Sequence, residues 1–171
     1  MARVIGLVGL RGAGKTLVAN HLAEHHGFIV VGFKDTLVRM LASMGLTPGE
    51  LDGALKEEPC GILCGKTPRH AMQTLGSEWG RQMIGVKAWA RLASPHQNVV
   101  ADDVRFPNEV KAVKDLGGEV WKIDRPGLTS NGHDTERPDA LVTDLVIPNE
   151  GDIFDLLAEV NKFIANRATF K

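Results

Sequence analysis

The sequence predicts an α/β protein built on a parallel sheet with helices on both faces. Short apolar runs alternate with helix-like segments, a glycine-rich loop joins the first run to the first helix, and no internal repeat is present. Parallel strands require crossover connections, which helices commonly supply. We therefore expect a single domain over residues 1–171, a length that can bury its own core.

The composition is typical of a soluble globular protein, with 43% hydrophobic and 24% charged residues. Lys and Arg total 20 against 21 Asp and Glu, and this balance argues against a broad nucleic-acid-binding or membrane-binding face. Cys60 and Cys64 lack the partners of a four-ligand zinc site, so we expect free thiols in a reducing compartment. The short apolar run at the start leads straight into the glycine loop, so we expect a cytoplasmic protein.

The part before residue 97 is predicted to hold two strands and mostly helical chain. The expected elements are strands over 3–9 and 28–33, helices over 15–27, 34–45 and 67–84, and short helices after 47 and around 86–93. Gly27 closes the first helix, and Thr47 and Thr67 each precede a proline, as helix N-termini often do. Residues 53–66 are rich in Gly and Pro and are expected to be irregular. The segment 34–97 is therefore a helical insertion, expected at the carboxyl edge of the sheet, where ligands bind in this architecture.

The part after residue 97 is predicted to complete the sheet. The expected elements are strands over 98–104 and 119–124, a strand with a turn over 144–151, and helices over 108–118 and 152–167. Residues 125–140 show no apolar periodicity and contain two prolines, so we expect a long loop of the kind that serves as a lid.

The segment "GLRGAGKT" at residues 9–16 predicts a nucleoside-triphosphate site. It matches G-x-x-x-x-G-K-[ST] in full and lies between a strand and a helix, where backbone N–H groups and the helix N-terminus bind phosphate oxygens. The dinucleotide pattern G-x-G-x-x-G fails, because Leu17 stands at its third glycine. Lys15 is expected to reach the β- and γ-phosphates, and the Thr16 hydroxyl to bind Mg²⁺. The ATP-binding residues expected here are Gly9, Gly12, Ala13, Gly14, Lys15, Thr16 and Leu17.

The rest of the sequence favours a small-molecule kinase over other triphosphate-binding proteins. A GTPase would carry N-K-x-D, whereas Asn161-Lys162 is followed by Phe163 and Ile164. A motor ATPase would normally have a longer chain. A kinase needs an acceptor site, cations at the transferring phosphoryl group and a closing lid. The cations expected from the phosphate loop and the long loop are Arg11, Arg125 and Arg137.

Acceptor-side candidates follow the third predicted strand and lie on the 67–84 helix. Because side chains alternate along a strand, Asp102 and Asp103 should point to opposite sides. One of them would hold a Mg²⁺-bound water or orient the acceptor, or else both cap the strand end. Arg105 places a guanidinium at the same edge. Arg69 and Gln73 share a helix face that either grips one ligand or is simply solvated.

Several segments together resemble the bacteriophage deoxynucleoside monophosphate kinases. Besides the phosphate loop, the matching segments are "FKDTL", "TPRHAMQTLGSEWGR", "ADDVRFPNEV", "GGEVWKIDRPG", "HDTE" and "DLVIPNEG", in this order over nearly the whole chain. The resemblance implies a P-loop kinase fold with a five-stranded parallel sheet. It also implies that the γ-phosphoryl group of ATP is transferred to a deoxynucleoside 5′-monophosphate, with Mg²⁺ as the cofactor.

Carried over residue by residue, the resemblance assigns roles to individual side chains. It puts Lys15 and Thr16 at the triphosphate and Mg²⁺, and it favours Asp103 over Asp102 as the aspartate that acts on the metal through water. The acceptor-binding residues that it implies are Asp35, Arg69, Gln73, Trp79, Arg81 and Arg105. The turn that borders the adenine would hold Asn149 and Gly151. Many relatives read G-K-D-T where this chain has Gly14-Lys15-Thr16-Leu17, so details of their metal site do not transfer directly.

Two other functions stay open. "DVR" with a late "HDTE" loop also resembles the animal-type phosphomevalonate kinases, although the "TPR...Q" helix argues against them. A nucleotide-binding regulator without turnover is the third alternative, and it would leave the aligned arginines without a purpose. The accepted base, the preference for deoxyribose and the oligomeric state also stay open, with a homodimer as one alternative.

Overall fold

The structure is a computed structural model that describes residues 3–84, 97–129 and 138–168. By its internal contacts the chain divides into two compact units, which are described separately. The first unit, here called the sheet unit, comprises residues 1–31 and 93–171; the second, the helical unit, comprises residues 32–92. The predicted helix around 86–93 and half of the predicted lid loop, residues 130–137, lie outside the described residues.

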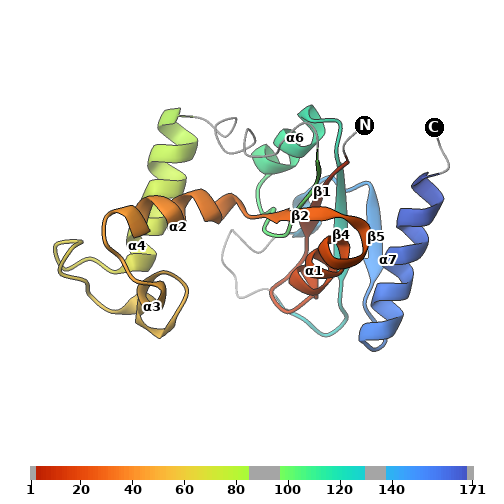
Figure 1. Cartoon of the computed structure of the whole chain (residues 1–171), viewed down its shortest axis with the longest axis horizontal. Coiled ribbons are helices and arrows are strands. Elements are labelled where there is room, and N and C mark those ends of the chain that lie inside the picture. Colours follow the sequence, from red (N-terminus) through yellow and green to blue (C-terminus); the bar gives the residue numbers. More distant parts are fainter. Residues whose placement is uncertain (1–2, 85–96, 130–137, 169–171) are drawn as a thin grey trace. The chain divides into compact units, whose positions relative to one another are not determined.

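The sheet unit is built on five parallel strands, which confirms the predicted α/β class (Figure 1). The strands are β1 (Val4–Val8), β2 (Phe28–Val31), β3 (Asn98–Ala101), β4 (Glu119–Asp124) and β5 (Leu145–Pro148). Their order in the sheet is β2-β3-β1-β4-β5. The chain thus builds one side of β1 first and then crosses to the other side, which makes the carboxyl end of β1 the switch point where ligands bind in such sheets.

Helices cover both faces of this sheet. They are α1 (Lys15–His26), α6 (Pro107–Asp115) and α7 (Ile153–Ala168), with a 3₁₀ turn η4 (Pro138–Ala140) before β5. Side chains of α1 and α7 share one buried core with alternate residues of the strands, among them Leu7 and Trp121. On the other face, α6 comes so close that a Cβ atom on Gly6 would lie 3.0 Å from the Val113 side chain. With both faces covered, the edge formed by the strand ends is the part of the sheet left for a ligand.

The helical unit contains α2 (Phe33–Ser43), α3 (Pro48–Leu51), the 3₁₀ turn η1 (Ala54–Glu57), α4 (Pro68–Thr74) and η2 (Leu75–Ile84). Among its described residues, Leu41, Leu46 and Leu51 form a small buried cluster. The predicted helix over 67–84 is present, but its second half is wound as a π-helix. Of the residues predicted to be irregular, 54–57 form the short turn η1. Among all the described helices, none is both long and apolar enough to cross a membrane.

A carboxylate network ties the chain around α3 together. The Glu50 carboxylate accepts hydrogen bonds from the Thr47 backbone N–H at 2.7 Å and the Thr47 hydroxyl at 2.8 Å, and from the Cys60 thiol at 3.2 Å. These bonds favour the ionised form and lower the pKa of Glu50 from its usual 4.5, the Thr47 backbone bond contributing most. The Cys60 thiol is also buried, so the network joins the start of α3 to the chain that follows η1.

Glu50→Gln is expected to lower the stability of the protein at pH 7, with a difference that disappears in acid. The pKa of Glu50 is lower in the folded than in the unfolded state, so its contribution is complete above pH 4.5 and is lost as the pH falls through the folded-state pKa. Urea unfolding of both proteins across this pH range measures the difference. Glu58→Gln, at an exposed position, serves as the control. A difference that stays constant down to pH 3 contradicts the assignment.

Candidate functional site

The phosphate loop runs from the end of β1 to the start of α1, as the sequence predicts. Gly9 has φ 148°, and a Cβ atom there would lie 2.5 Å from the Ile123 carbonyl oxygen of β4. Gly14 has φ 104° and precedes the first residue of α1. Side chains at these two positions would be strained, and at Gly9 would also collide with the sheet, so glycine is required for the loop to fold against β4.

Lys15 lies folded over this loop. Its ammonium group donates hydrogen bonds to the carbonyl oxygens of Gly9 and Leu10, each at 2.8 Å. The backbone of Lys15 lies at the end of the phosphate loop, whereas its Nζ atom is held at the beginning of the loop.

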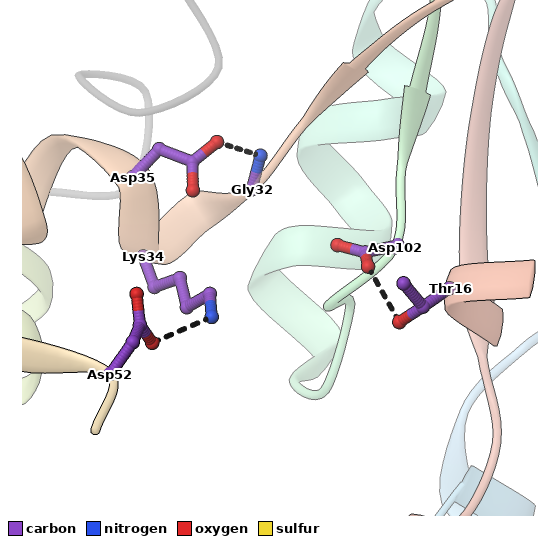
Figure 2. A network of polar contacts seen from close by, with 6 residues as sticks. All are labelled: Thr16, Gly32, Lys34, Asp35, Asp52 and Asp102. Carbon is purple, nitrogen blue, oxygen red and sulfur yellow. Dashed lines mark hydrogen bonds and ion pairs between the residues drawn. The ribbon is translucent and has the colours of Figure 1, made fainter. Parts of the chain in front are cut away.

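Thr16 contacts Asp102, and this contact overturns one sequence-based expectation. The Thr16 hydroxyl donates to an Asp102 carboxylate oxygen at 3.0 Å (Figure 2). Alternation along a strand reaching residue 104, with Asp103 favoured at the metal, implied that Asp102 points away from it, but β3 ends at Ala101, so Asp102 lies beyond the strand, where alternation no longer applies. Asp103 follows as a half-buried residue, and whether Asp103 or Asp102 acts on the metal is left to the comparison of variants proposed below.

Two further arginines predicted near the triphosphate are described by the structure. The Arg125 guanidinium, just after β4, donates to the Gly12 carbonyl oxygen at 3.3 Å. Arg11 is exposed on the loop itself. Arg137 lies outside the described residues. Arg125 is thus held at the phosphate loop by a contact that the sequence spacing alone does not reveal.

Asn149, the residue that follows β5, is hydrogen-bonded to the phosphate loop. Its side-chain amide donates to the Ala13 carbonyl oxygen at 2.9 Å, and its backbone N–H donates to the Asp124 carbonyl at 2.7 Å. Because C=O and N–H point in opposite directions across a planar peptide, this bond also orients the N–H of Gly14. Gly151, the other residue predicted in this turn, leaves no room for a side chain, since Asp155 fills the space.

The loop after β3 is fixed by a buried carboxylate that the sequence analysis did not single out. Glu109 is only 2% exposed and accepts hydrogen bonds from the backbone N–H groups of Arg105 and Phe106 at 2.7 and 3.1 Å. The signal was present in the sequence, because a proline at the first helical position followed by Glu two residues later is typical of a helix start. Arg105 itself is exposed.

The predicted acceptor-side residues of the helical unit have differing surroundings. The Asp35 carboxylate accepts from the Gly32 backbone N–H at 2.6 Å and so caps α2 (Figure 2). Arg69, in the first turn of α4, pairs with Glu57 of η1. Gln73 is exposed and Trp79 is 39% exposed. Nothing is described of the Arg81 side chain.

The described side chains offer oxygen ligands to a metal, but not a complete set. Among the described residues, no group of three or more His, Cys, Asp or Glu side chains is placed to hold a metal ion. Thr16 and Asp102 provide a hydroxyl and a carboxylate at 3.0 Å from each other. Mg²⁺ binds through few protein ligands and completes its shell with water and substrate phosphates, so this pair fits a Mg²⁺–nucleotide complex.

A relative with a curated name extends along almost the whole chain. A protein of Acanthamoeba polyphaga mimivirus, with the provisional name "deoxynucleotide monophosphate kinase", is 31% identical over 186 aligned positions. The alignment covers 95% of this chain and 96% of the mimivirus protein. The chain belongs to the family of this mimivirus protein. It matches no protein-family model, so membership of a family specific to bacteriophages stays a prediction.

Solved structures with the same fold are P-loop kinases. Shikimate kinase from Aquifex aeolicus has a TM-score of 0.56 at 11% identity, with 98% of this chain and 99% of that chain covered. The APS kinase of Mycobacterium tuberculosis, solved with AMPPNP and APS, has a TM-score of 0.53 at 14% identity, with 98% of each chain covered. At these identities the likeness establishes the P-loop kinase fold and leaves the acceptor open.

Asn149→Leu is expected to loosen the binding of ATP. Leucine keeps the approximate size but leaves the Ala13 carbonyl without its donor, at a cost of about 1 kcal/mol, so the KM for ATP should rise about fivefold. Inhibition by inorganic tripolyphosphate, which has no base, should weaken by a similar factor because the effect acts through the loop.

Steady-state kinetics with Glu150→Gln, a change at the exposed neighbouring residue, provides the control for Asn149→Leu. If Asn149→Leu weakens ATP but leaves tripolyphosphate inhibition unchanged, Asn149 acts on the adenine instead.

Proposed function

We propose that this protein transfers the γ-phosphoryl group of ATP to a deoxynucleoside 5′-monophosphate. The observation that carries the proposal is the meeting of the phosphate loop, the Lys15 ammonium and the Thr16–Asp102 pair at the end of β1. The likeness to the mimivirus protein supports a nucleotide as the acceptor, since that protein is named for such a substrate.

The triphosphate side of the reaction rests on the phosphate loop. Its backbone N–H groups and the N-terminus of α1 bind the phosphates, and Lys15 leaves the Gly9 and Leu10 carbonyls to neutralise charge on the β- and γ-phosphates. A phosphate oxygen of the acceptor attacks the γ-phosphorus, the bond from that phosphorus to the β–γ bridging oxygen breaks, and ADP leaves. Arg125, held at the Gly12 carbonyl, is proposed to stabilise the charge that develops at the transferring group.

Thr16 and Asp102 are proposed to hold the Mg²⁺ of the Mg²⁺–ATP complex. A carboxylate only accepts hydrogen bonds, so the Thr16 hydroxyl group donates its proton to Asp102. The lone pairs of the Thr16 hydroxyl oxygen are then left for a cation. The Asp102 carboxylate would help to hold the metal, as an acidic residue does together with the loop Ser or Thr in P-loop enzymes. When bound, Mg²⁺ would supply positive charge that offsets the negative charge of the triphosphate.

The acceptor is proposed to bind through residues of the helical unit. Arg69 offers a planar guanidinium to the 5′-phosphate, Gln73 follows it on α4, and Trp79 offers an aromatic face to the base. Arg81, of the same unit, is proposed as a further phosphate ligand, and a role of Arg105 in acceptor binding stays the expectation drawn from the sequence.

A coupled ADP-release assay with the wild type and Lys15→Ala tests the proposal. We expect turnover with at least one of dAMP, dCMP, dGMP and dTMP, and none with phosphomevalonate. Lys15→Ala should lower kcat by about a hundredfold or more, because charge stabilisation worth about 3 kcal/mol is lost at the transferring group. The thermal unfolding temperature of Lys15→Ala should differ little from that of the wild type. Activity of Lys15→Ala within threefold of the wild type would contradict the assignment, and turnover of phosphomevalonate alone would favour the rival kinase.

The two aspartates after β3 are expected to differ in their effect on the metal. Asp102→Asn removes the charge beside Thr16, so it should lower kcat and raise the Mg²⁺ concentration needed for half-maximal rate by about tenfold. Asp103→Asn is the matched change one residue later and should leave this Mg²⁺ requirement within about twofold of the wild type. Rates measured against Mg²⁺ at saturating ATP compare the two variants. If Asp103→Asn raises the required Mg²⁺ concentration more than Asp102→Asn does, Asp103 is the residue that acts on the metal.

A further inference from the structure

An ion pair in the helical unit joins two elements that are separated in sequence. The Nε–H group of Arg69 donates to a carboxylate oxygen of Glu57. Arg69 lies in the first turn of α4, and Glu57 is the last residue of η1. No helical or strand periodicity relates residues 12 positions apart in this way, so the pair is a product of the fold.

Both ends of this pair are anchored by backbone contacts. Before η1, Gly53 packs so tightly that a Cβ atom there would lie 2.6 Å from the Gly49 carbonyl oxygen of α3. After η1, the Cys60 backbone N–H donates to the Lys66 carbonyl at 3.0 Å, which closes the connection to α4. The Thr67 hydroxyl then caps α4 by accepting from the His70 N–H. Glu57 and Arg69 therefore meet across a short, closed segment.

The atoms used by the pair leave the outer edge of the guanidinium available. Glu57 takes the Nε–H, whereas a guanidinium binds a phosphate best through two parallel N–H donors, which the Nη1 and Nη2 atoms supply. Both side chains are half exposed, 46% for Arg69 and 57% for Glu57, so a ligand can approach. An arginine held by its inner nitrogen also loses less rotational freedom when it binds an anion.

We propose that Glu57 is a positioning residue that holds the Arg69 guanidinium for the 5′-phosphate of the acceptor. This inference rests on the proposed function and names a residue that the phosphate need not touch. Two other readings predict different results. An ordinary exposed ion pair contributes little and would leave kinetics unchanged. A Glu57 that competes with the phosphate for Arg69 would weaken acceptor binding, so its removal would improve it.

Kinetic analysis of three variants tests the positioning role, using the deoxynucleoside monophosphate that the wild type phosphorylates fastest. Glu57→Ala should raise the acceptor KM about three- to tenfold and leave the KM for ATP within twofold. Glu57→Gln keeps an accepting oxygen for the Nε–H and should recover most of this loss. Glu58→Ala, at the exposed neighbouring residue, should behave as the wild type.

Adding Glu57→Ala to an Arg69→Lys variant shows whether Glu57 acts by positioning the Arg69 guanidinium or only through its charge. Lysine has no Nε–H, so Glu57→Ala should add less than a twofold change to Arg69→Lys. An unchanged or lower acceptor KM in Glu57→Ala overturns the inference, as does a fully additive effect in this background. A wild type that phosphorylates none of the four nucleotides overturns the proposed function, and this inference with it. Normal turnover with a silent Glu57→Ala overturns the inference alone.

Discussion

The pairing of β1 with β3 is the constraint on which the phosphate site depends. The register that matches Gly6 with Ala101 brings the chain after Ala101 beside the chain after β1. Asp102 therefore emerges next to the loop that leads to Thr16, although 86 positions separate the two residues. A one-residue change of register would move the carboxylate along the sheet edge and break the hydrogen bond. The chemistry proposed for the metal is thus a consequence of strand order.

Several side chains donate hydrogen bonds to the phosphate loop, and in each case the acceptor is a carbonyl oxygen of the loop. Lys15 binds the carbonyls of Gly9 and Leu10, Arg125 binds that of Gly12, and Asn149 binds that of Ala13. Short loops of this kind expose polar backbone groups that need partners. Engaging the carbonyls with side-chain donors gives the loop a defined shape before a ligand arrives, so its N–H groups need little rearrangement to bind phosphate.

The sequence predicted the features that are encoded locally. The phosphate loop is a contiguous pattern, and the five parallel strands follow from apolar runs separated by helices. Asp102 was assigned the wrong orientation because the strand was expected to run to residue 104, whereas the backbone leaves the sheet after Ala101. The contact of Asn149 with Ala13 spans 136 positions, and the pair of Glu57 with Arg69 depends on how η1 packs. Neither contact follows from helical or strand periodicity, so a single sequence could not predict it.

The two units differ in what keeps their functional residues in place. In the sheet unit, the triphosphate side is supported by a continuous core that includes Leu7, Trp121 and Ile147, all below 2% exposure. In the described part of the helical unit, the buried cluster comprises three leucines, so polar contacts such as those of Glu50 and Glu57 carry more of its local order. Solved structures that share this fold bear the names of kinases for chemically different acceptors, shikimate and APS among them. Because the fold is common to them while the acceptors differ, the fold alone cannot set the choice of acceptor, and we look for it in the helical unit, around Arg69 and Trp79.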